Sequence, residues 1–186
     1  MDEYRLFMLL LGCRPTGRNT EQHDIYFGIA KTLRDLIPAI QTFWKSSGNI
    51  HIDAWRMVNY VDGFQIKISE KTNNSQEEKK LFFLNLGGYK ENEFEEFHYK
   101  ILTVSKDKSE AIAAAKKSAF FQHTGFGKLA TSHIDDKFGV DVDDIFEIKD
   151  ILTTADKMNF SISIAKSKTK LPEDILNLGY FKLANL

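Results

Sequence analysis

Leu6-Phe7-Met8-Leu9-Leu10-Leu11-Gly12 and Leu81-Phe82-Phe83-Leu84-Asn85-Leu86-Gly87 are near-copies of one apolar heptapeptide, which occurs twice in the chain, 75 positions apart. Two polar residues recur at the same offset: Glu21 is matched by Glu96, and His23 by His98. Self-similarity at a fixed period is the signature of a repeated structural unit. The sequence therefore predicts two tandem copies of one fold.

A second match extends the repeat toward the C-terminus. His51-Ile52-Asp53 returns as His133-Ile134-Asp135, at an offset of 82. The change of offset places an insertion in the second copy between residues 120 and 132, where Gly125 and Gly127 indicate a loop.

Each copy is predicted to contain two strands, a helix and two further strands. The apolar heptapeptide is the first strand, and alternating apolar residues in 23–30 and 98–105 predict the second. The helix of the first copy should have Thr32 as its N-cap, with Pro38 either kinking it or delaying its start. In the second copy the predicted N-cap is Asp107.

The predicted fold class is α+β, with mainly antiparallel sheets and two ββαββ copies related by a pseudo-two-fold axis. A turn at Asp143-Asp144 should precede the last strand of the second copy, although residues 145–152 also fit one face of a helix. After the repeat, alternation in 160–164 predicts a strand, and Pro172 should open a short helix. The predicted organisation has four segments: a first repeat (1–68), a polar linker (69–80), a second repeat (81–152) and a C-terminal strand-helix extension (153–186).

The composition excludes several classes of protein. The chain has 186 residues and a net charge of −1, so it lacks the basic surface of a nucleic-acid-binding protein. Its apolar runs are much shorter than the roughly 20 residues of a membrane span. The single cysteine, Cys13, rules out an internal disulfide framework and is typical of a reducing compartment. We therefore expect a cytoplasmic protein, either a monomer or a homodimer.

The polar residues that could form a site are concentrated around the second predicted strand of the first copy. The candidates are Arg14, Arg18, Glu21, His23 and Asp24. Two guanidinium groups four residues apart can bind a phosphate or a carboxylate, so the pattern predicts an anion site. His and carboxylate side chains could also ligate a divalent metal, but their spacing matches no known signature, and no metal centre is expected. The other interpretation is that these residues cap strand edges and form surface ion pairs.

Comparison of the two copies separates structural from functional candidates. Polar residues present in both copies are expected to be structural: His51, Asp53, Glu96, His98, His133 and Asp135. Arg14 and Arg18 have Tyr89 and Glu93 at the matching positions of the second copy. The two arginines are therefore the better functional candidates.

The chain contains no P-loop, dinucleotide fingerprint or serine-nucleophile motif. We therefore expect a non-enzymatic binding or regulatory module whose partner is a small anion or another protein. The alternative is a small hydrolase or isomerase that acts on an anionic metabolite through the Arg14, Arg18, Glu21 and His23 cluster. Catalytic residues and cofactors stay unknown at this stage. Cys13 should be a small buried residue, because its spacing from Arg18 is one residue short of a phosphatase loop.

Five stretches carry a resemblance to a known family: Leu-Gly-Cys-Arg-Pro-Thr-Gly-Arg (11–18), Glu-Gln-His-Asp (21–24), His-Ile-Asp-Ala-Trp-Arg (51–56), Val-Asp-Gly (61–63) and His-Ile-Asp-Asp-Lys-Phe-Gly-Val-Asp-Val-Asp-Asp (133–144). They resemble an uncharacterised, mostly bacterial family, domain of unknown function 1543, whose members carry one or two copies of the domain. The resemblance covers residues 6 to about 152. It implies a duplicated domain in a cytoplasmic protein, and it implies no activity, because the family has none assigned.

Overall fold

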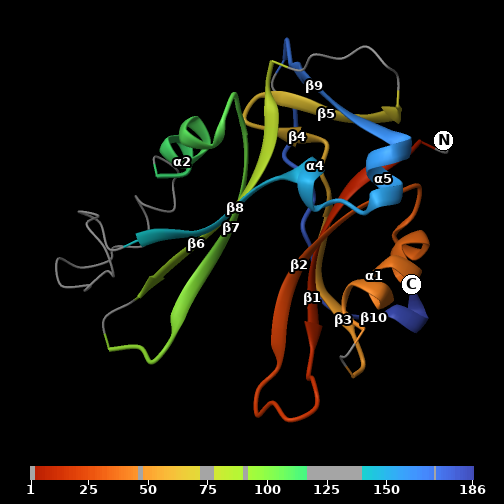
Figure 1. Ribbon diagram of the computed structural model, residues 1–186, viewed down its shortest axis with the longest axis vertical. Helices are drawn as coiled ribbons and strands as arrows, with labels where there is room; N and C mark the ends of the chain where they lie inside the picture. Colours follow the sequence, from red (N-terminus) through yellow and green to blue (C-terminus); the bar gives the residue numbers. More distant parts are fainter. Residues whose placement is uncertain (1–2, 46–47, 72–77, 90–91, 117–139, 170) are drawn as a thin grey trace. The chain divides into compact units, whose positions relative to one another are not determined.

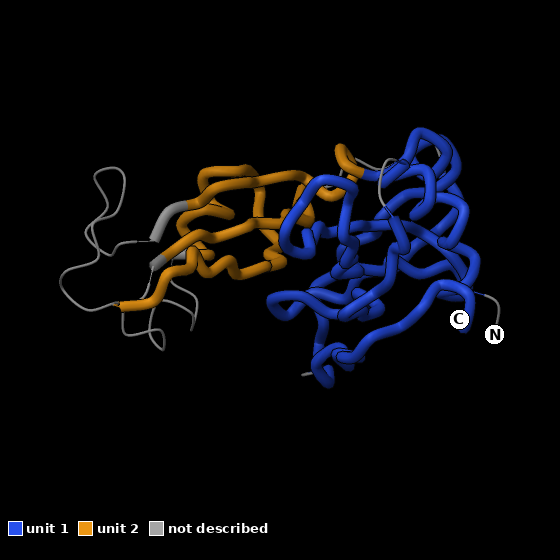
Figure 2. Tube along the Cα trace, turned by 90° about the horizontal axis from the view of Figure 1, so that it is seen from below, with its two compact units in different colours: residues 1–75, 152–186 blue, residues 76–151 orange. Residues whose placement is uncertain are grey.

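The protein is a mixed α+β structure with antiparallel sheets and few helices (Figure 1). The computed structural model describes residues 3–45, 48–71, 78–89, 92–116, 140–169 and 171–186. The chain divides into two compact units, which Figure 2 shows in different colours. Unit 1 comprises residues 1–75 and 152–186, and unit 2 comprises residues 76–151. No helix in the described part of the chain is long and apolar enough to cross a membrane.

Unit 1 contains two antiparallel sheets with the strand orders β10-β3-β1-β2 and β4-β5-β9. Its elements are β1 (Arg5–Cys13), β2 (Gln22–Ala30), η1 (Leu33–Leu36), α1 (Ile37–Phe43), β3 (His51–Met57), β4 (Tyr60–Val61), β5 (Phe64–Glu70), α5 (Thr154–Asn159), β9 (Phe160–Lys166), β10 (Asn177–Lys182) and η2 (Leu183–Asn185). The strand expected at 160–164 is thus confirmed as part of β9.

Pro38 sets where the first α-helix begins. Residues 33–36 form a single 3-10 turn, and Pro38 is the second residue of α1. An N–H at this position has no acceptor within the helix, so the proline costs the helix no hydrogen bond. The expectation that Pro38 delays the start of the helix is therefore confirmed. Ahead of the turn, the Asp35 carboxylate accepts hydrogen bonds from the N–H and the O–H of Thr32, both at 2.8 Å.

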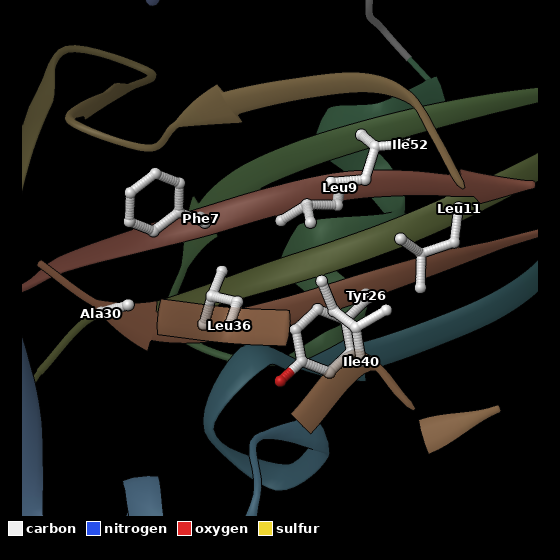
Figure 3. Close-up of a cluster of buried hydrophobic side chains, with 8 residues drawn as sticks. All are labelled: Phe7, Leu9, Leu11, Tyr26, Ala30, Leu36, Ile40 and Ile52. Carbon is white, nitrogen blue, oxygen red and sulfur yellow. The ribbon is translucent and has the colours of Figure 1, made fainter. Parts of the chain in front are cut away.

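The core of unit 1 lies between its four-stranded sheet and α1. Leu36 and Ile40 face side chains of the sheet in Figure 3. The buried cluster consists of Phe7, Leu9, Leu11, Tyr26, Ala30, Leu36, Ile40 and Ile52. Since β1 runs through the middle of this sheet, nearly all of its residues are buried, which explains why its sequence is a continuous apolar run.

Unit 2 contains one antiparallel sheet in the order β7-β6-β8. Its elements are β6 (Lys80–Tyr89), β7 (Glu96–Ser105), α2 (Lys108–Lys116), β8 (Val140–Glu147) and α4 (Ile148–Ile151). Asp107 caps α2 as expected, because its carboxylate accepts a hydrogen bond from the Glu110 N–H at 2.8 Å.

The buried cores of the two units use matching positions. The unit 2 cluster consists of Phe82, Leu84, Leu86, Ala111 and Ala115. Each lies 75 positions after a core residue of unit 1, in the order Phe7, Leu9, Leu11, Leu36 and Ile40. The helix of unit 2 therefore offers alanines to its core where the helix of unit 1 offers Leu and Ile.

The last strand expected in the second repeat is not formed where the sequence placed it. Asp143 and Asp144 lie inside β8 rather than in a turn, and residues 148–151 form the helix α4. Ile148 and Leu152 are four residues apart and are both buried, which is the spacing of one helix face. The helical alternative for 145–152 is therefore correct for residues 148–151, whereas residues 145–147 belong to β8.

The short helix expected after Pro172 is also wrong. Residues 171–176 have no regular structure, and β10 follows them. The Asp174 carboxylate accepts hydrogen bonds from the N–H of Asn59 at 3.1 and 3.2 Å, which ties this segment to the end of β3. Phe181, opposite Ile52, then packs on the core of unit 1. Pairing with an otherwise open strand edge thus outweighs the local signal of a proline.

Candidate functional site

Three neighbouring strands of unit 1 meet at Gly12. The strand registers pair Gly12 with His23 on β2 and with His51 on β3. Residues paired across antiparallel strands face the same side of the sheet. A Cβ atom at Gly12 would overlap the side chains of Glu21, His51 and Asp53. The glycine therefore leaves free the space in which these side chains converge.

Asp53 belongs to this group because of a β-bulge in β3. Leu11 pairs with Ile52 and Leu10 with Ala54, so Asp53 is an extra residue with no partner on β1. A bulge bends its strand and changes the direction of the extra side chain. Here it brings the Asp53 carboxylate to the two histidines.

We call Glu21, His23, His51 and Asp53 the unit 1 cluster. The Nε2 atom of His51 lies 2.6 Å from Oε1 of Glu21 and 3.3 Å from Oδ1 of Asp53. Nε2 of His23 lies 3.2 Å from Oδ2 of Asp53. Ligand atoms of Glu21, His23 and Asp53 all lie within 4.8 Å of one another, so these three could hold a metal ion. Two carboxylates and two imidazole nitrogens thus lie close together beside Gly12.

Burial differs strongly within the unit 1 cluster. The His51 side chain is 7% exposed, whereas that of His23 is 47% exposed. The His51 ring packs on Tyr180 of β10, with ring centroids 4.2 Å apart. Two buried polar atoms, Nδ1 of His51 and Oδ2 of Asp53, have no hydrogen-bond partner in the part of the chain that the structure describes. Unpaired buried polar atoms are costly, so they commonly mark a place with a function.

Unit 2 repeats the arrangement with three residues. Glu96, His98 and Asp143, which we call the unit 2 cluster, also bring ligand atoms within 4.8 Å of one another. Nε2 of His98 lies 3.3 Å from Oδ2 of Asp143 and 3.9 Å from Oε2 of Glu96. Gly87 pairs with His98, and a Cβ atom at Gly87 would overlap Asp143.

The third member of the unit 2 cluster differs from the residue that the sequence match indicated. His133 and Asp135 lie outside the described residues. In β8, Leu86 pairs with Val142 and Asn85 with Asp144, so Asp143 is the extra residue of a bulge at the position equivalent to Asp53. By the same register Asp141, opposite Gly87, stands where unit 1 has His51. The structural offset in this strand is therefore 90, not the 82 of the His-Ile-Asp match, and only the paired register could have identified Asp143.

The two arginines do not join the unit 1 cluster. Nη2 of Arg14 donates a hydrogen bond to the carbonyl of Asn19 at 3.1 Å, and the Arg18 N–H closes a turn onto the carbonyl of Pro15. Both arginines are exposed, and within the described residues no ion pair links either of them to Glu21. Asp24 accepts a hydrogen bond from the Ile25 N–H through its own carboxylate. Cys13, as expected, is fully buried.

Comparisons with known proteins give a family resemblance and a fold but no activity. Residues 18–68, which include the whole unit 1 cluster, match the family described as Domain of Unknown Function (DUF1543). The crystal structure of protein Il1583 from Idiomarina loihiensis is similar over 97% of this chain and 98% of that chain, with a TM-score of 0.65 and 22% sequence identity. No protein with a curated description matches the sequence. At this level of identity, the structural similarity establishes the fold alone.

Proposed function

We propose that the protein is a non-enzymatic binding module of the cytoplasm and that its ligand is a divalent transition-metal ion. The observation that carries the proposal is that both units bring a Glu, a His and an Asp together at equivalent places on their sheets. Imidazole nitrogen and carboxylate oxygen are the ligands that Zn²⁺ and related ions take in proteins. This departs from the sequence-based expectation of an anion site without a metal.

The electrostatics of the clusters support a cation. Each cluster places two carboxylates close together. Such a pair repels itself unless a positive charge lies between the oxygens. A divalent ion would supply that charge and would also bind the imidazole nitrogens.

We also propose that the two units are tandem copies of one ancestral domain. Three features support this: the core positions match at one offset, the Gly–His pairing recurs, and the bulge before the Asp occurs at the same register. Independent origins would have no reason to reproduce all three. The pseudo-two-fold arrangement of the copies stays a prediction.

The competing hydrolase or isomerase hypothesis has less support. It requires Arg14 and Arg18 to act on an anionic substrate together with Glu21 and His23. The Arg14 guanidinium is instead engaged by the carbonyl of Asn19 within its own loop. A metal-bound water could still support hydrolysis, so the experiment must include an activity measurement.

The test is metal binding to the full chain after removal of metal with a chelator. Calorimetric titration with Zn²⁺ and Mn²⁺ should find two sites in the wild type. Glu21→Gln and Glu96→Gln should each weaken one site by about ten-fold or more, because each removes one charged ligand. Glu93→Gln and Glu95→Gln, beside Glu96 in the chain but outside the cluster, are matched controls and should bind as the wild type does.

Two results would contradict the proposal. A wild type that binds no divalent ion, or glutamine variants that bind it as tightly as the wild type, would show that the clusters are not metal sites. Turnover of any substrate in a broad hydrolase screen, abolished by His23→Ala, would overturn the non-enzymatic assignment.

A further inference from the structure

The unit 1 cluster contains a residue that the unit 2 cluster lacks. We propose that Nε2 of His51 is a fourth protein ligand, so that unit 1 holds a closed, four-coordinate Zn²⁺ site of two histidines and two carboxylates. Unit 2, in which three ligands lie together among the described residues, is then the more open and weaker site. The inference rests on the proposed function and assigns to each site its coordination and its metal class.

The position of His51 is that of a ligand already in place. Its Nε2 contacts both carboxylates of the cluster, at 2.6 Å from Glu21 and 3.3 Å from Asp53. Nε2 of the ring lies in the space that Gly12 leaves free, and the ring packs on Tyr180. A side chain held in this way loses little further freedom on binding, which favours a tight site.

The distances fit a small tetrahedral ion. Ligands at about 2.1 Å from Zn²⁺ lie about 3.4 Å from one another in a tetrahedron. Nε2 of His23 lies 3.2 Å from Oδ2 of Asp53, and Nε2 of His51 lies 3.3 Å from Oδ1, so each imidazole is at this spacing from a different oxygen of the same carboxylate. His51 and Glu21 are closer, at 2.6 Å, which is a hydrogen-bonding distance. A bound metal ion would replace the hydrogen bond between His51 and Glu21. The two ligand atoms would then move apart by less than about 1 Å to reach the tetrahedral spacing.

Two buried polar atoms of the unit 1 cluster that have no hydrogen-bond partner among the described residues support the same assignment. Oδ2 of Asp53 is buried and accepts no hydrogen bond from the described residues, although Nε2 of His23 is only 3.2 Å away. An ion bound between these two atoms would satisfy the carboxylate oxygen. Nδ1 of His51, which has no hydrogen-bond partner among the described residues, would carry the ring proton when Nε2 is the ligand.

Unit 2 differs from unit 1 at the position of His51 and in what lies beside the strand that carries it. Asp141 stands at the position of His51, so this register position of unit 2 carries no imidazole. In the described part of unit 2, β8 is the outermost strand of its sheet, so no strand lies beside it as β10 lies beside β3. His98 and Glu96 are 3.9 Å apart, and the side chains of all three cluster residues are between 31% and 41% exposed. Three exposed ligands leave coordination positions to water, as in sites from which metals exchange readily.

Co²⁺ is the probe that reports the coordination directly, because four-coordinate Co²⁺ absorbs visible light far more strongly than six-coordinate Co²⁺. Chelator-stripped wild type should show strong visible bands with its first equivalent of Co²⁺ and only weak additional absorption with the second. Added Zn²⁺ should remove the strong bands first. His51→Gln should abolish the strong bands and weaken the tighter Zn²⁺ site by about 10–100-fold. Asp141→Asn, at the matching position of unit 2, should leave the strong bands intact.

The outcomes separate this inference from the proposed function. A wild type that binds neither Co²⁺ nor Zn²⁺ overturns both. A wild type that binds two ions with weak absorption only, or His51→Gln protein that keeps the strong bands, overturns the four-coordinate site and leaves the metal-binding function standing. The wild-type spectrum decides even if His51→Gln fails to fold, and retention of the weaker site by His51→Gln shows that unit 2 remains intact.

Discussion

The two clusters are formed by the same local features of the strands but differ in how deeply their side chains are buried. Gly12 and Gly87 each leave room beside a histidine on the neighbouring strand, and a bulge supplies Asp53 in one unit and Asp143 in the other. What differs is the surroundings: unit 1 adds a buried histidine and the strand β10. A shared arrangement of strands can therefore carry two sites of different character when one residue and one neighbouring strand change.

The cores show a similar contrast. Leu36 and Ile40 of unit 1 are replaced in unit 2 by Ala111 and Ala115, while the sheet residues stay large and apolar. Smaller side chains on the helix bury less apolar area, and buried area is the main source of stability. We therefore expect the sheet residues to carry a larger share of the core in unit 2 than in unit 1.

The largest effect should come from Leu9→Ala and Leu84→Ala, at matching positions on β1 and β6. Both side chains are fully buried, so each substitution should lower the free energy of unfolding by about 2–5 kcal/mol. Urea denaturation followed by fluorescence and circular dichroism measures the loss. A loss below about 1 kcal/mol at Leu84 would show that the unit 2 core relaxes around a cavity in a way that the unit 1 core does not.

Gly12→Ala and Gly87→Ala should have the next largest effect on stability. A new Cβ at Gly12 collides with three side chains of its cluster, including the buried His51, whereas at Gly87 its three nearest atoms all belong to Asp143. We expect a loss of about 1–3 kcal/mol for Gly12→Ala and a smaller loss for Gly87→Ala, which has a more exposed neighbour to displace. Metal titration of Gly12→Ala should show the tighter site gone. Gly48→Ala is the control, because its Cβ would meet only the Arg14 carbonyl, at 3.3 Å; equal losses in all three variants would mean that the clusters do not depend on the glycines.

Removal of a helix cap in each unit should have a moderate and similar effect. Asp107 accepts from the Glu110 N–H at the start of α2, and Thr153 accepts from the Asp156 N–H at the start of α5. Asp107→Ala and Thr153→Ala should each lower stability by about 1 kcal/mol. Thermal unfolding of both variants measures the effect, and an unchanged melting temperature for Asp107→Ala would show that α2 contributes little to the folded state of unit 2.

The smallest effect concerns Tyr26, whose position in unit 2 is occupied by Ile101. Burial, followed by the negative charge of Asp156, raises the pKa of Tyr26 to about 12. Because the folded-state pKa is raised, its contribution to stability is present below the ordinary tyrosine value of about 10 and is lost as the pH rises from there toward 12. Its buried hydroxyl forms no hydrogen bond with the described residues, so Tyr26→Phe should be as stable as the wild type near neutral pH and lose less stability in alkali. Parallel losses for the two proteins between about pH 9 and pH 11 would show that other groups cause the alkaline sensitivity.

Much of the fold was accessible from local signals. The apolar runs 6–11 and 81–86 predicted the central strands, because a strand covered on both faces needs apolar residues at every position. Pro38 and Asp107 marked helix starts correctly, since capping and the missing proline N–H act within one turn. The four residues of the unit 1 cluster were singled out as polar candidates, but they were divided between an anion site and structural pairs.

The amino-acid sequence by itself determined the positions of these strands and helices and the recurrence of Glu and His at one offset. Only the tertiary structure decided that Asp143 is the partner of His98, that β10 lies beside β3, and that His51 is enclosed by Tyr180. The physical reason is the range of the interactions involved. Propensity and capping act between neighbours in the chain, whereas a bulge moves the register by one residue only where two distant strands pair. A single residue of register is enough to decide which aspartate completes a site.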